Sequence, residues 1–331
     1  MKLGKAFSTF FCIAAAIVAL SSCKKKNEDD TLYFSGNLKV HGGKSIIAQG
    51  ETLKFTADGL TGTEGLDLTY KWTVTDKSKA DTSYLAKGEW EYTFPKDGLK
   101  TYTVTCTVSA TGYYSASGTT NLTMVKPGPD GSIPEIFNNE DTDFVTDEDG
   151  NAYSYVKIGD LFWTTRNLGT SKAGVSYFDA PIMNGISGKY YTYDEALTIC
   201  PEGWRLPTDA EWMSVAQTLT EEPLKEHETW KGVCGGFMIY ANFNEYKLWD
   251  FWPEVDVTNS TDLRVIPVGY ANTETLNFES FNEQAVFWTA DERNDEQAFV
   301  RYIVESVPDM YCMAAHKSSF GASVRCVKDA E

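Results

Sequence analysis

The sequence predicts two folded domains, an all-β sandwich followed by a mixed α+β domain. Apolar and polar side chains alternate with a period of two over residues 34–126, as they do in strands that bury one face. Two helix starts with capping residues lie at 192–195 and 208–211, and a final strand is expected at 323–328. Between the halves, residues 127–143 are rich in proline, glycine and acidic side chains, which indicates a linker.

The chain begins with a segment typical of a bacterial secretion signal. Lys2 and Lys5 form a short positive region, and the apolar stretch at 10–20 is too short to span a bilayer. The sequence LSSC at 20–23 resembles the bacterial lipobox. That resemblance implies that residues 1–22 are removed as a signal peptide and that Cys23 is the site of lipidation. The alternative is an ordinary secretory signal with an incidental cysteine.

Residues 23–33 are predicted to be a lipidated, flexible tether. The run KKKNEDD at 24–30 has no apolar side chain and cannot pack. An acidic cluster just after an acylated cysteine resembles the surface-export signal of Bacteroidetes lipoproteins, and a plain solvated spacer is the alternative. We therefore expect an outer-membrane protein at the cell surface, held by an N-terminal lipid anchor.

The first domain spans residues 34–126 and shows several half-buried strands. Two strand faces carry the pattern: Leu68, Tyr70, Trp72 and Val74 in one strand, and Tyr102, Val104, Cys106 and Val108 in another. Turn signals such as Asp58-Gly59 and Asp97-Gly98 separate the strands. Several short alternating strands favour a sandwich of two sheets.

The motifs GETL at 50–53, YKW at 70–72 and YTV at 102–104 resemble an immunoglobulin-like domain of the polycystic-kidney-disease type. The resemblance implies that Trp72 is a buried core tryptophan. It also implies a spacer role for the domain. Cys106 lies where immunoglobulins place a core cysteine, but without a partner we interpret it as a buried thiol.

The linker at 127–143 combines three prolines with acidic residues that continue to position 149. The prolines favour an extended spacer. Clustered carboxylates are one possible calcium site, since calcium takes six to eight oxygen ligands. The spacing is not that of an EF-hand loop, and Asp149-Gly150-Asn151 is better interpreted as a hairpin turn before a strand at 152–158.

The second domain, 144–331, is expected to contain two helices with capping boxes, Thr192 with Glu195 and Thr208 with Glu211. Two apolar stripes follow at helical spacing: Tyr193, Ala196, Leu197 and Cys200 in the first helix, and Trp212, Val215, Ala216 and Leu219 in the second. Both stripes are predicted to face the core.

The chain of 331 residues carries a formal net charge of −18. Removal of Lys2 and Lys5 with the signal peptide changes the formal net charge from −18 to −20. So acidic a protein repels nucleic acid, which excludes that class of partner. Aromatic residues make up 14% of the chain, which suits either an aromatic core or the stacking faces of a sugar site.

Four cysteines fall in the second half of the chain: Cys200, Cys234, Cys312 and Cys326. In an oxidising compartment four cysteines indicate two disulfides, with three possible connectivities. Their spacing is too wide for a zinc knuckle, and no other set of residues with metal-ligand spacing is visible.

Motifs of the second half resemble the Fibrobacter succinogenes major paralogous domain family. The resemblance covers residues 144–329 and rests on several motifs: DGN at 149–151, VKIG at 156–159, CPEGWRLPT at 200–208, FWTA at 287–290 and SVRCV at 323–327. That family is similar to C-type lectin-like folds, which implies an α+β C-type lectin-like domain. It also implies the disulfide Cys200–Cys326, which leaves Cys234–Cys312 as the second.

The segment at 229–252 departs from the family motifs and supplies the candidate ligand-binding residues. These are Trp230, Tyr246, Trp249, Asp250 and Trp252. Exposed aromatic rings with amide and carboxylate neighbours have the composition of a sugar-binding platform. The alternative is a partly buried loop cluster.

The sequence shows no catalytic motif, and its three histidines are scattered. We therefore expect a non-catalytic surface lipoprotein that binds extracellular glycan, or a host or neighbouring surface glycoprotein, as an adhesin. No cofactor is expected, with calcium as the one alternative. Other functions that remain open are an extracellular enzyme acting on sugar or peptide and a structural subunit of a surface or pilus assembly.

Overall fold

The computed structural model describes residues 31–76, 80–85, 87–96, 101–125, 141–243, 246–249 and 255–330. Cys23 and most of the predicted linker lie outside the described residues. In the described part of the chain, no helix has the length and apolar character needed to span a membrane.

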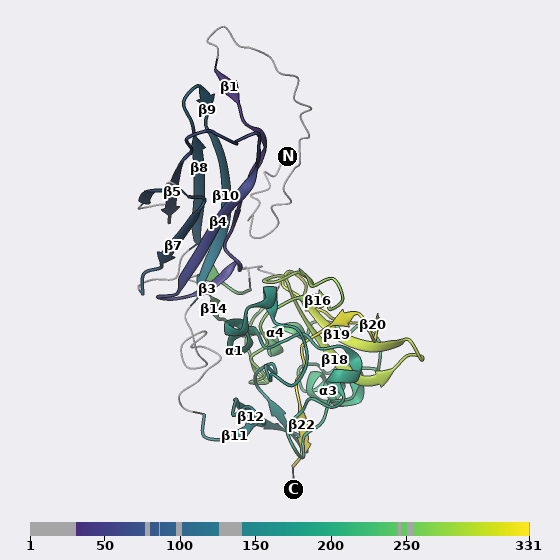
Figure 1. Cartoon of the computed structure of the whole chain (residues 1–331). Coiled ribbons are helices and arrows are strands. Elements are labelled where there is room, and N and C mark those ends of the chain that lie inside the picture. Colours follow the sequence, from purple (N-terminus) through teal and green to yellow (C-terminus); the bar gives the residue numbers. More distant parts are fainter. Residues whose placement is uncertain are drawn as a thin grey trace, which may run out of the picture.

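The first domain consists of strands in two main sheets (Figure 1). The strands are β1 (Leu32–Tyr33), β2 (Ser35–His41), β3 (Ile46–Ala48), β4 (Thr52–Thr61), β5 (Thr69–Thr75), β6 (Ala80–Leu85), β7 (Glu89–Thr93), β8 (Thr101–Ser109), β9 (Tyr113–Tyr114) and β10 (Ala116–Val125). One sheet has the order β3-β10-β8-β5-β6 and the other has the order β2-β4-β7. The two-residue strands β1 and β9 pair with each other.

Both sheets contribute side chains to one core, as the period-two pattern predicts. Trp72 and Cys106 face each other across the β5–β8 pair, and both are fully buried. Phe55 of β4 and Trp90 of β7 pack against Trp72 from the opposite sheet. Cys106 is a free thiol, and burial raises its pKa to about 12. The predicted buried tryptophan and the predicted buried thiol are therefore confirmed.

The second domain combines short helices with several small sheets. Its helices are the 3₁₀ turns η1 (Tyr177–Asp179) and η2 (Pro181–Met183), followed by α1 (Asn184–Ser187), α2 (Tyr193–Ala196), α3 (Asp209–Gln217) and α4 (Cys234–Phe237). Its strands are β11 (Phe144–Thr146), β12 (Ala152–Ile158), β13 (Leu161–Thr164), β14 (Asn242–Phe243), β15 (Tyr246–Lys247), β16 (Tyr270–Asn272), β17 (Asn277–Glu279), β18 (Gln284–Glu292), β19 (Gln297–Val304), β20 (Met310–His316), β21 (Phe320–Gly321) and β22 (Val327–Asp329).

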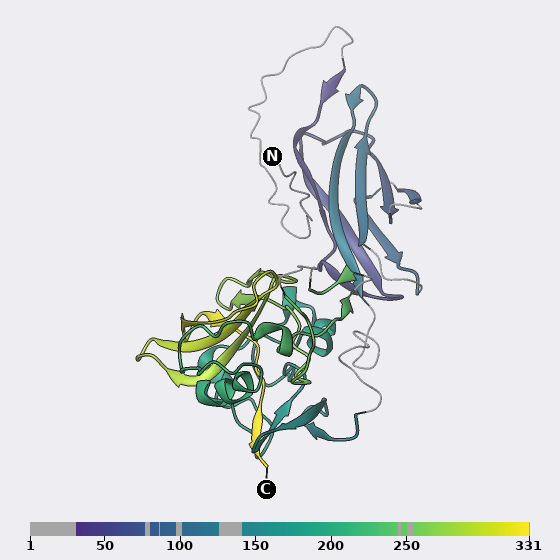
Figure 2. The same ribbon diagram turned by 180° about the vertical axis from the view of Figure 1, so that it is seen from behind.

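The end of the chain pairs with the beginning of the second domain. Strand β22 is antiparallel to β13, with Leu161 opposite Asp329, and completes the sheet β11-β12-β13-β22. Both views place β11, β12 and β22 at the end of the second domain away from the first domain (Figures 1 and 2). The first and last strands of the second domain therefore lie in the same sheet.

The two predicted capping boxes are present, at Thr192 with Glu195 and at Thr208 with Glu211. The first predicted stripe is wrong in part. Helix α2 ends at Ala196, and Leu197 is 44% exposed because the chain turns there instead of continuing as a helix.

The disulfide Cys200–Cys326 is formed, with a Cα–Cα distance of 5.9 Å, and confirms the first predicted pairing. It ties the segment after α2 to the residue just before β22. Its two cysteines are 126 residues apart, so the bond closes a loop through most of the domain.

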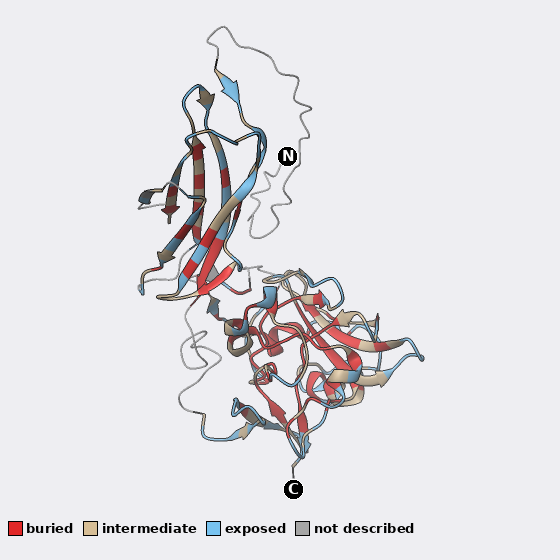
Figure 3. Cartoon of the chain, in the orientation of Figure 1, coloured by how far each residue is buried: buried red, intermediate tan, exposed pale blue. Residues whose placement is uncertain are grey.

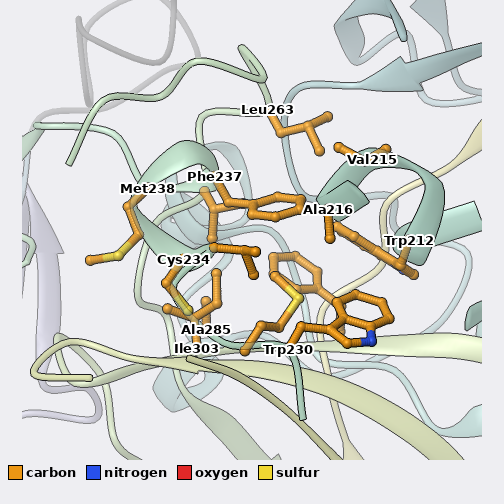
Figure 4. Close-up of a cluster of buried hydrophobic side chains, with 14 of the residues drawn as sticks. Trp212, Val215, Ala216, Trp230, Cys234, Phe237, Met238, Leu263, Ala285 and Ile303 are labelled. Carbon is orange, nitrogen blue, oxygen red and sulfur yellow. The ribbon is translucent and has the colours of Figure 1, made fainter. Parts of the chain in front are cut away.

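Buried residues concentrate in the interior of the second domain (Figure 3). One core cluster lies around α3 and α4, where Trp212, Phe237 and Leu263 pack with Ile303 of the β18-β19-β20 sheet (Figure 4). A second cluster covers the other face of that sheet and includes Trp288.

A further apolar cluster is shared by the two domains. Ile46 and Val125, from β3 and β10, belong to it together with Ala241 and Leu248, which flank the β14–β15 hairpin. All four side chains are buried. Part of the segment predicted to bind ligand therefore packs where the first domain meets the second.

Candidate functional site

Trp230 is a core residue, so the prediction that it forms an exposed binding platform is wrong. Its side chain is 0% exposed, and its indole Nε1–H donates to the carbonyl of Lys225 at 2.8 Å. The guanidinium of Arg301 lies 3.3 Å from the centre of its ring. A ring whose face is covered and whose polar atom is satisfied is not available to a sugar.

Trp249 is also buried, at 2% exposure, and the prediction is wrong for it too. Its Nε1–H donates to the carbonyl of Val265 at 3.0 Å, and its ring joins the cluster around α3 and α4. Tyr246 starts β15, but its side chain lies outside the described residues, as do Asp250 and Trp252. Of the five predicted ligand contacts, the two whose side chains are described are therefore both buried.

Among the described side chains of this segment, Tyr240 is a large aromatic residue exposed to solvent. It is 50% exposed and lies between the buried Met238 and the buried Ala241, which is followed by the exposed Asn242. The ammonium group of Lys247 lies 5.9 Å from the centre of its ring. The prediction was based on the tryptophans of the segment and therefore missed Tyr240. The alternation of apolar and polar residues around Tyr240 could have indicated its exposure.

The second predicted disulfide, Cys234–Cys312, is not formed, and both residues are free thiols. Cys234 is buried in α4 beside Trp230 and Ile303, in surroundings shown in Figure 4. Cys312 lies on β20 opposite Arg301 and has other charged neighbours. Burial raises the pKa of Cys312 to about 11 and the pKa of Cys234 well above its usual range, so neither is a reactive thiolate.

A buried ion pair joins Asp209, the first residue of α3, to Arg301 on β19. Both side chains are 0% exposed, and Arg301 Nη2 donates to Asp209 Oδ2 at 2.6 Å. Arg301 Nη1 also donates to the carbonyl of Glu228 at 2.6 Å. The pair was not predicted, because its residues are 92 positions apart in the sequence.

Next to this pair, Glu226, His227 and Asp291 bring three ligand-type side chains together. One ligand atom from each lies within 4.8 Å of the other two. The main-chain N–H of His227 donates to Asp209 Oδ2 at 2.7 Å, and Asp291 Oδ2 accepts the main-chain N–H of Asp209 at 2.6 Å. Sequence reasoning predicted no metal ligands and missed this group, which is divided between two distant segments.

The acidic turn at 147–151 is a hairpin turn, as predicted, because β11 and β12 pair in antiparallel fashion across it. Asp147 accepts hydrogen bonds from the main chain of Asp149 and Asn151, and from the hydroxyl of Tyr153. Hydrogen bonds from Ser171 lower the pKa of Asp149 to about 2. These carboxylates thus hold the turn to the rest of the domain.

Two arginines of the family-like motifs have structural contacts. Arg205 pairs with Glu211 of α3 at 2.6 Å. Arg325 is fully buried and donates to Asn167 Oδ1 at 2.7 Å and to the carbonyl of Leu263 at 2.7 Å, so its partners are neutral.

Comparison with known proteins gives one informative match. The model of the Fibrobacter succinogenes major domain matches residues 156–328. No curated protein matches the chain.

Two solved structures resemble parts of the chain at 10% identity. The FN1–FN3 domains of chicken CNTN1 match 44% of this chain and 44% of that one, with a TM-score of 0.22. Spo0M, a sporulation control protein from Bacillus subtilis, matches 39% of this chain and 65% of that one, with a TM-score of 0.20. The chain therefore covers less than two thirds of either structure, and likeness at this level carries no functional conclusion.

Proposed function

The chain belongs to the Fibrobacter succinogenes major domain family, and from this premise we propose that it is a lipid-anchored surface protein that binds extracellular glycan without catalysis. The second domain is the binding head, and the first is a spacer between the lipid on Cys23 and the head. The location is the outer membrane, facing the outside of the cell.

The exposed ring of Tyr240 carries the binding proposal. It is half exposed, whereas Trp230, Phe237 and Trp249 of the same segment are buried. The ammonium group of Lys247 lies near the ring, and the exposed Asn242 is two residues further along the chain. An aromatic face stacks on the C–H face of a sugar ring, and polar neighbours bind its hydroxyl groups.

The pKa values of three carboxyl groups favour binding over catalysis. The carboxyl groups of Asp141, Asp149 and Glu211 have lowered pKa values, each through hydrogen bonds from neighbouring side chains. A general acid that works at neutral pH needs a raised carboxyl pKa. The shifts of these three groups are those of structural carboxylates.

Two finer assignments of fold belong to the same proposal. A disulfide from the segment just after α2 to the residue before β22 supports a C-type lectin-like head. A sandwich with a central buried tryptophan, Trp72, supports an immunoglobulin-like spacer.

A glycan array probed with the purified full chain tests the proposal. With a ligand in hand, Tyr240→Ala should weaken binding by about 1–3 kcal/mol, as expected for an aromatic anchor, whereas Tyr240→Phe should keep most of the affinity. Tyr114→Ala is the matched control, because Tyr114 is an exposed tyrosine of the first domain. Equal loss in the Tyr114 variant, or none in the Tyr240 variant, would place the site elsewhere.

A second candidate function, a subunit of a surface assembly, is favoured by the outer edge of β20. Met310 exchanges both main-chain hydrogen bonds with Trp230, so its polar groups point away from β19. Because main-chain groups alternate in direction along a strand, those of Cys312 and Ala314 also point away from β19. In the part of the chain that the structure describes, β20 is an edge strand to which Trp230 is bridged at Met310, and an edge strand can accept a strand from another chain.

Light scattering during size-exclusion chromatography tests that second candidate. Assembly predicts oligomers that grow with concentration and are disrupted by Ala314→Pro, which removes an outward N–H. A monomer at every concentration would rule out self-assembly through this edge.

A further inference from the structure

We propose that Glu226, His227 and Asp291 form a binding site for a divalent metal ion of the zinc class. The first two residues lie in the segment between α3 and α4, and Asp291 lies near the end of β18. His227 Nε2 is 3.8 Å from Asp291 Oδ1, and the three ligand atoms are within 4.8 Å of one another. The glycan-binding proposal does not depend on this site.

Two contacts position His227, one through its main chain and one through its ring. Its main-chain N–H donates to Asp209 Oδ2 at 2.7 Å, and Asp209 is itself fixed by the buried ion pair with Arg301. The ring stacks on Phe299 with centroids 4.1 Å apart and an angle of 22° between planes. The stacking fixes the plane of the ring, and the main-chain hydrogen bond fixes the backbone that carries it.

Asp291 is oriented by the start of α3. Its Oδ2 accepts the main-chain N–H of Asp209 at 2.6 Å, and its Oδ1 is the oxygen nearest to His227. The same buried residue, Asp209, therefore positions two of the three ligands. Glu226 is exposed and supplies the adjustable ligand.

The local charge fits a divalent cation. Other carboxylates of this region have cationic partners: Asp209 with Arg301, Glu228 with Lys225, and Glu292 with Lys317. Among the described residues, no lysine or arginine makes an ion pair with Glu226 or Asp291. The two carboxylates then provide a charge of −2 for a +2 ion, and the imidazole adds a nitrogen donor.

The donor set selects the kind of metal. Calcium prefers six to eight oxygen ligands, whereas one imidazole nitrogen with two carboxylates suits zinc and its neighbours among the transition metals. Zinc–ligand distances of about 2.0–2.2 Å require the donor atoms to lie within about 4.4 Å of one another. The three donor atoms lie within 4.8 Å of one another, so a small movement of the exposed Glu226 side chain would bring the set to zinc distances.

Titration of the purified full chain with Zn²⁺, in competition with a chromophoric chelator, tests this site. We expect one equivalent of Zn²⁺ to bind, and Co²⁺ in its place to give a visible absorption band. His227→Ala and Asp291→Asn should each weaken binding by at least about tenfold. His41→Ala is the matched control, because His41 lies 3.3 Å from Asp58 on the first domain without a third ligand.

Two results would overturn the site. One is the absence of stoichiometric Zn²⁺ binding by the wild-type chain. The other is equal affinity in wild type and His227→Ala. Should His227→Ala fail to fold by circular dichroism, Glu226→Gln decides, because that side chain is exposed and its loss should still weaken binding at least about tenfold.

Discussion

Replacing Asp209 by alanine should destabilise the second domain strongly. Asp209 accepts hydrogen bonds from Arg301 and from the main chain of His227, and neither Asp209 nor Arg301 is exposed to solvent. The variant leaves the guanidinium with the carbonyl of Glu228 as its remaining acceptor, on the face of Trp230. Breaking a buried pair in this way costs about 3–5 kcal/mol.

The measurement is urea unfolding followed by tryptophan fluorescence and circular dichroism. Two domains give two transitions, and the transition of the first domain should be unchanged. Arg205→Met is the control, since Arg205 is 47% exposed in its pair with Glu211 and should cost less than about 1 kcal/mol.

A double variant separates charge from packing. Asp209→Leu with Arg301→Met removes both charges, so it should be less destabilised than Asp209→Ala alone. A loss below about 1 kcal/mol for Asp209→Ala would refute the reasoning, because an exposed pair behaves that way.

Three further predictions concern the anchor, the disulfide and acid stability. Cys23→Ala should move the chain from the membrane to the soluble fraction, and unchanged fractionation with no acylated peptide by mass spectrometry would contradict lipidation. Cys200→Ala opens a disulfide that spans 126 residues, and should cost about 2–5 kcal/mol in urea unfolding of the second domain; an unchanged midpoint would show that the bond is absent in solution. The pKa of Asp149 is about 2 in the folded chain, below its usual 3.8, so its stabilisation is complete above about pH 4 and disappears as the pH falls towards 2. Melting temperatures should therefore differ between wild type and Asp149→Asn at pH 5 and converge near pH 2, and a constant difference would contradict this origin.

The parts of the fold that sequence predicted are those with local causes. Capping boxes at Thr192 and Thr208 act within four residues, and the buried face around Trp72 follows from strand alternation. The prediction that the first helix continues past Ala196 was wrong. Helix length also depends on tertiary constraints, here the disulfide that fixes Cys200 to Cys326.

The candidate site was predicted poorly because exposure is set by distant partners. Trp230 is covered by Arg301, and Trp249 is satisfied by the carbonyl of Val265, and neither contact has a trace in the local sequence. The same holds for His227 and Asp291, whose meeting depends on where β18 ends relative to α3. Motif spacing finds metal ligands only when one segment supplies them.

The pairing of β22 with β13 has a practical consequence for protein display. Because that sheet lies at the end of the second domain opposite the first domain, a passenger fused after the last strand would project away from the first domain (Figure 2). Asp329 and Lys328 are exposed, so an added sequence would meet solvent at once. Combined with the proposed lipid anchor, this geometry would make the chain a scaffold for presenting epitopes or enzymes on a cell.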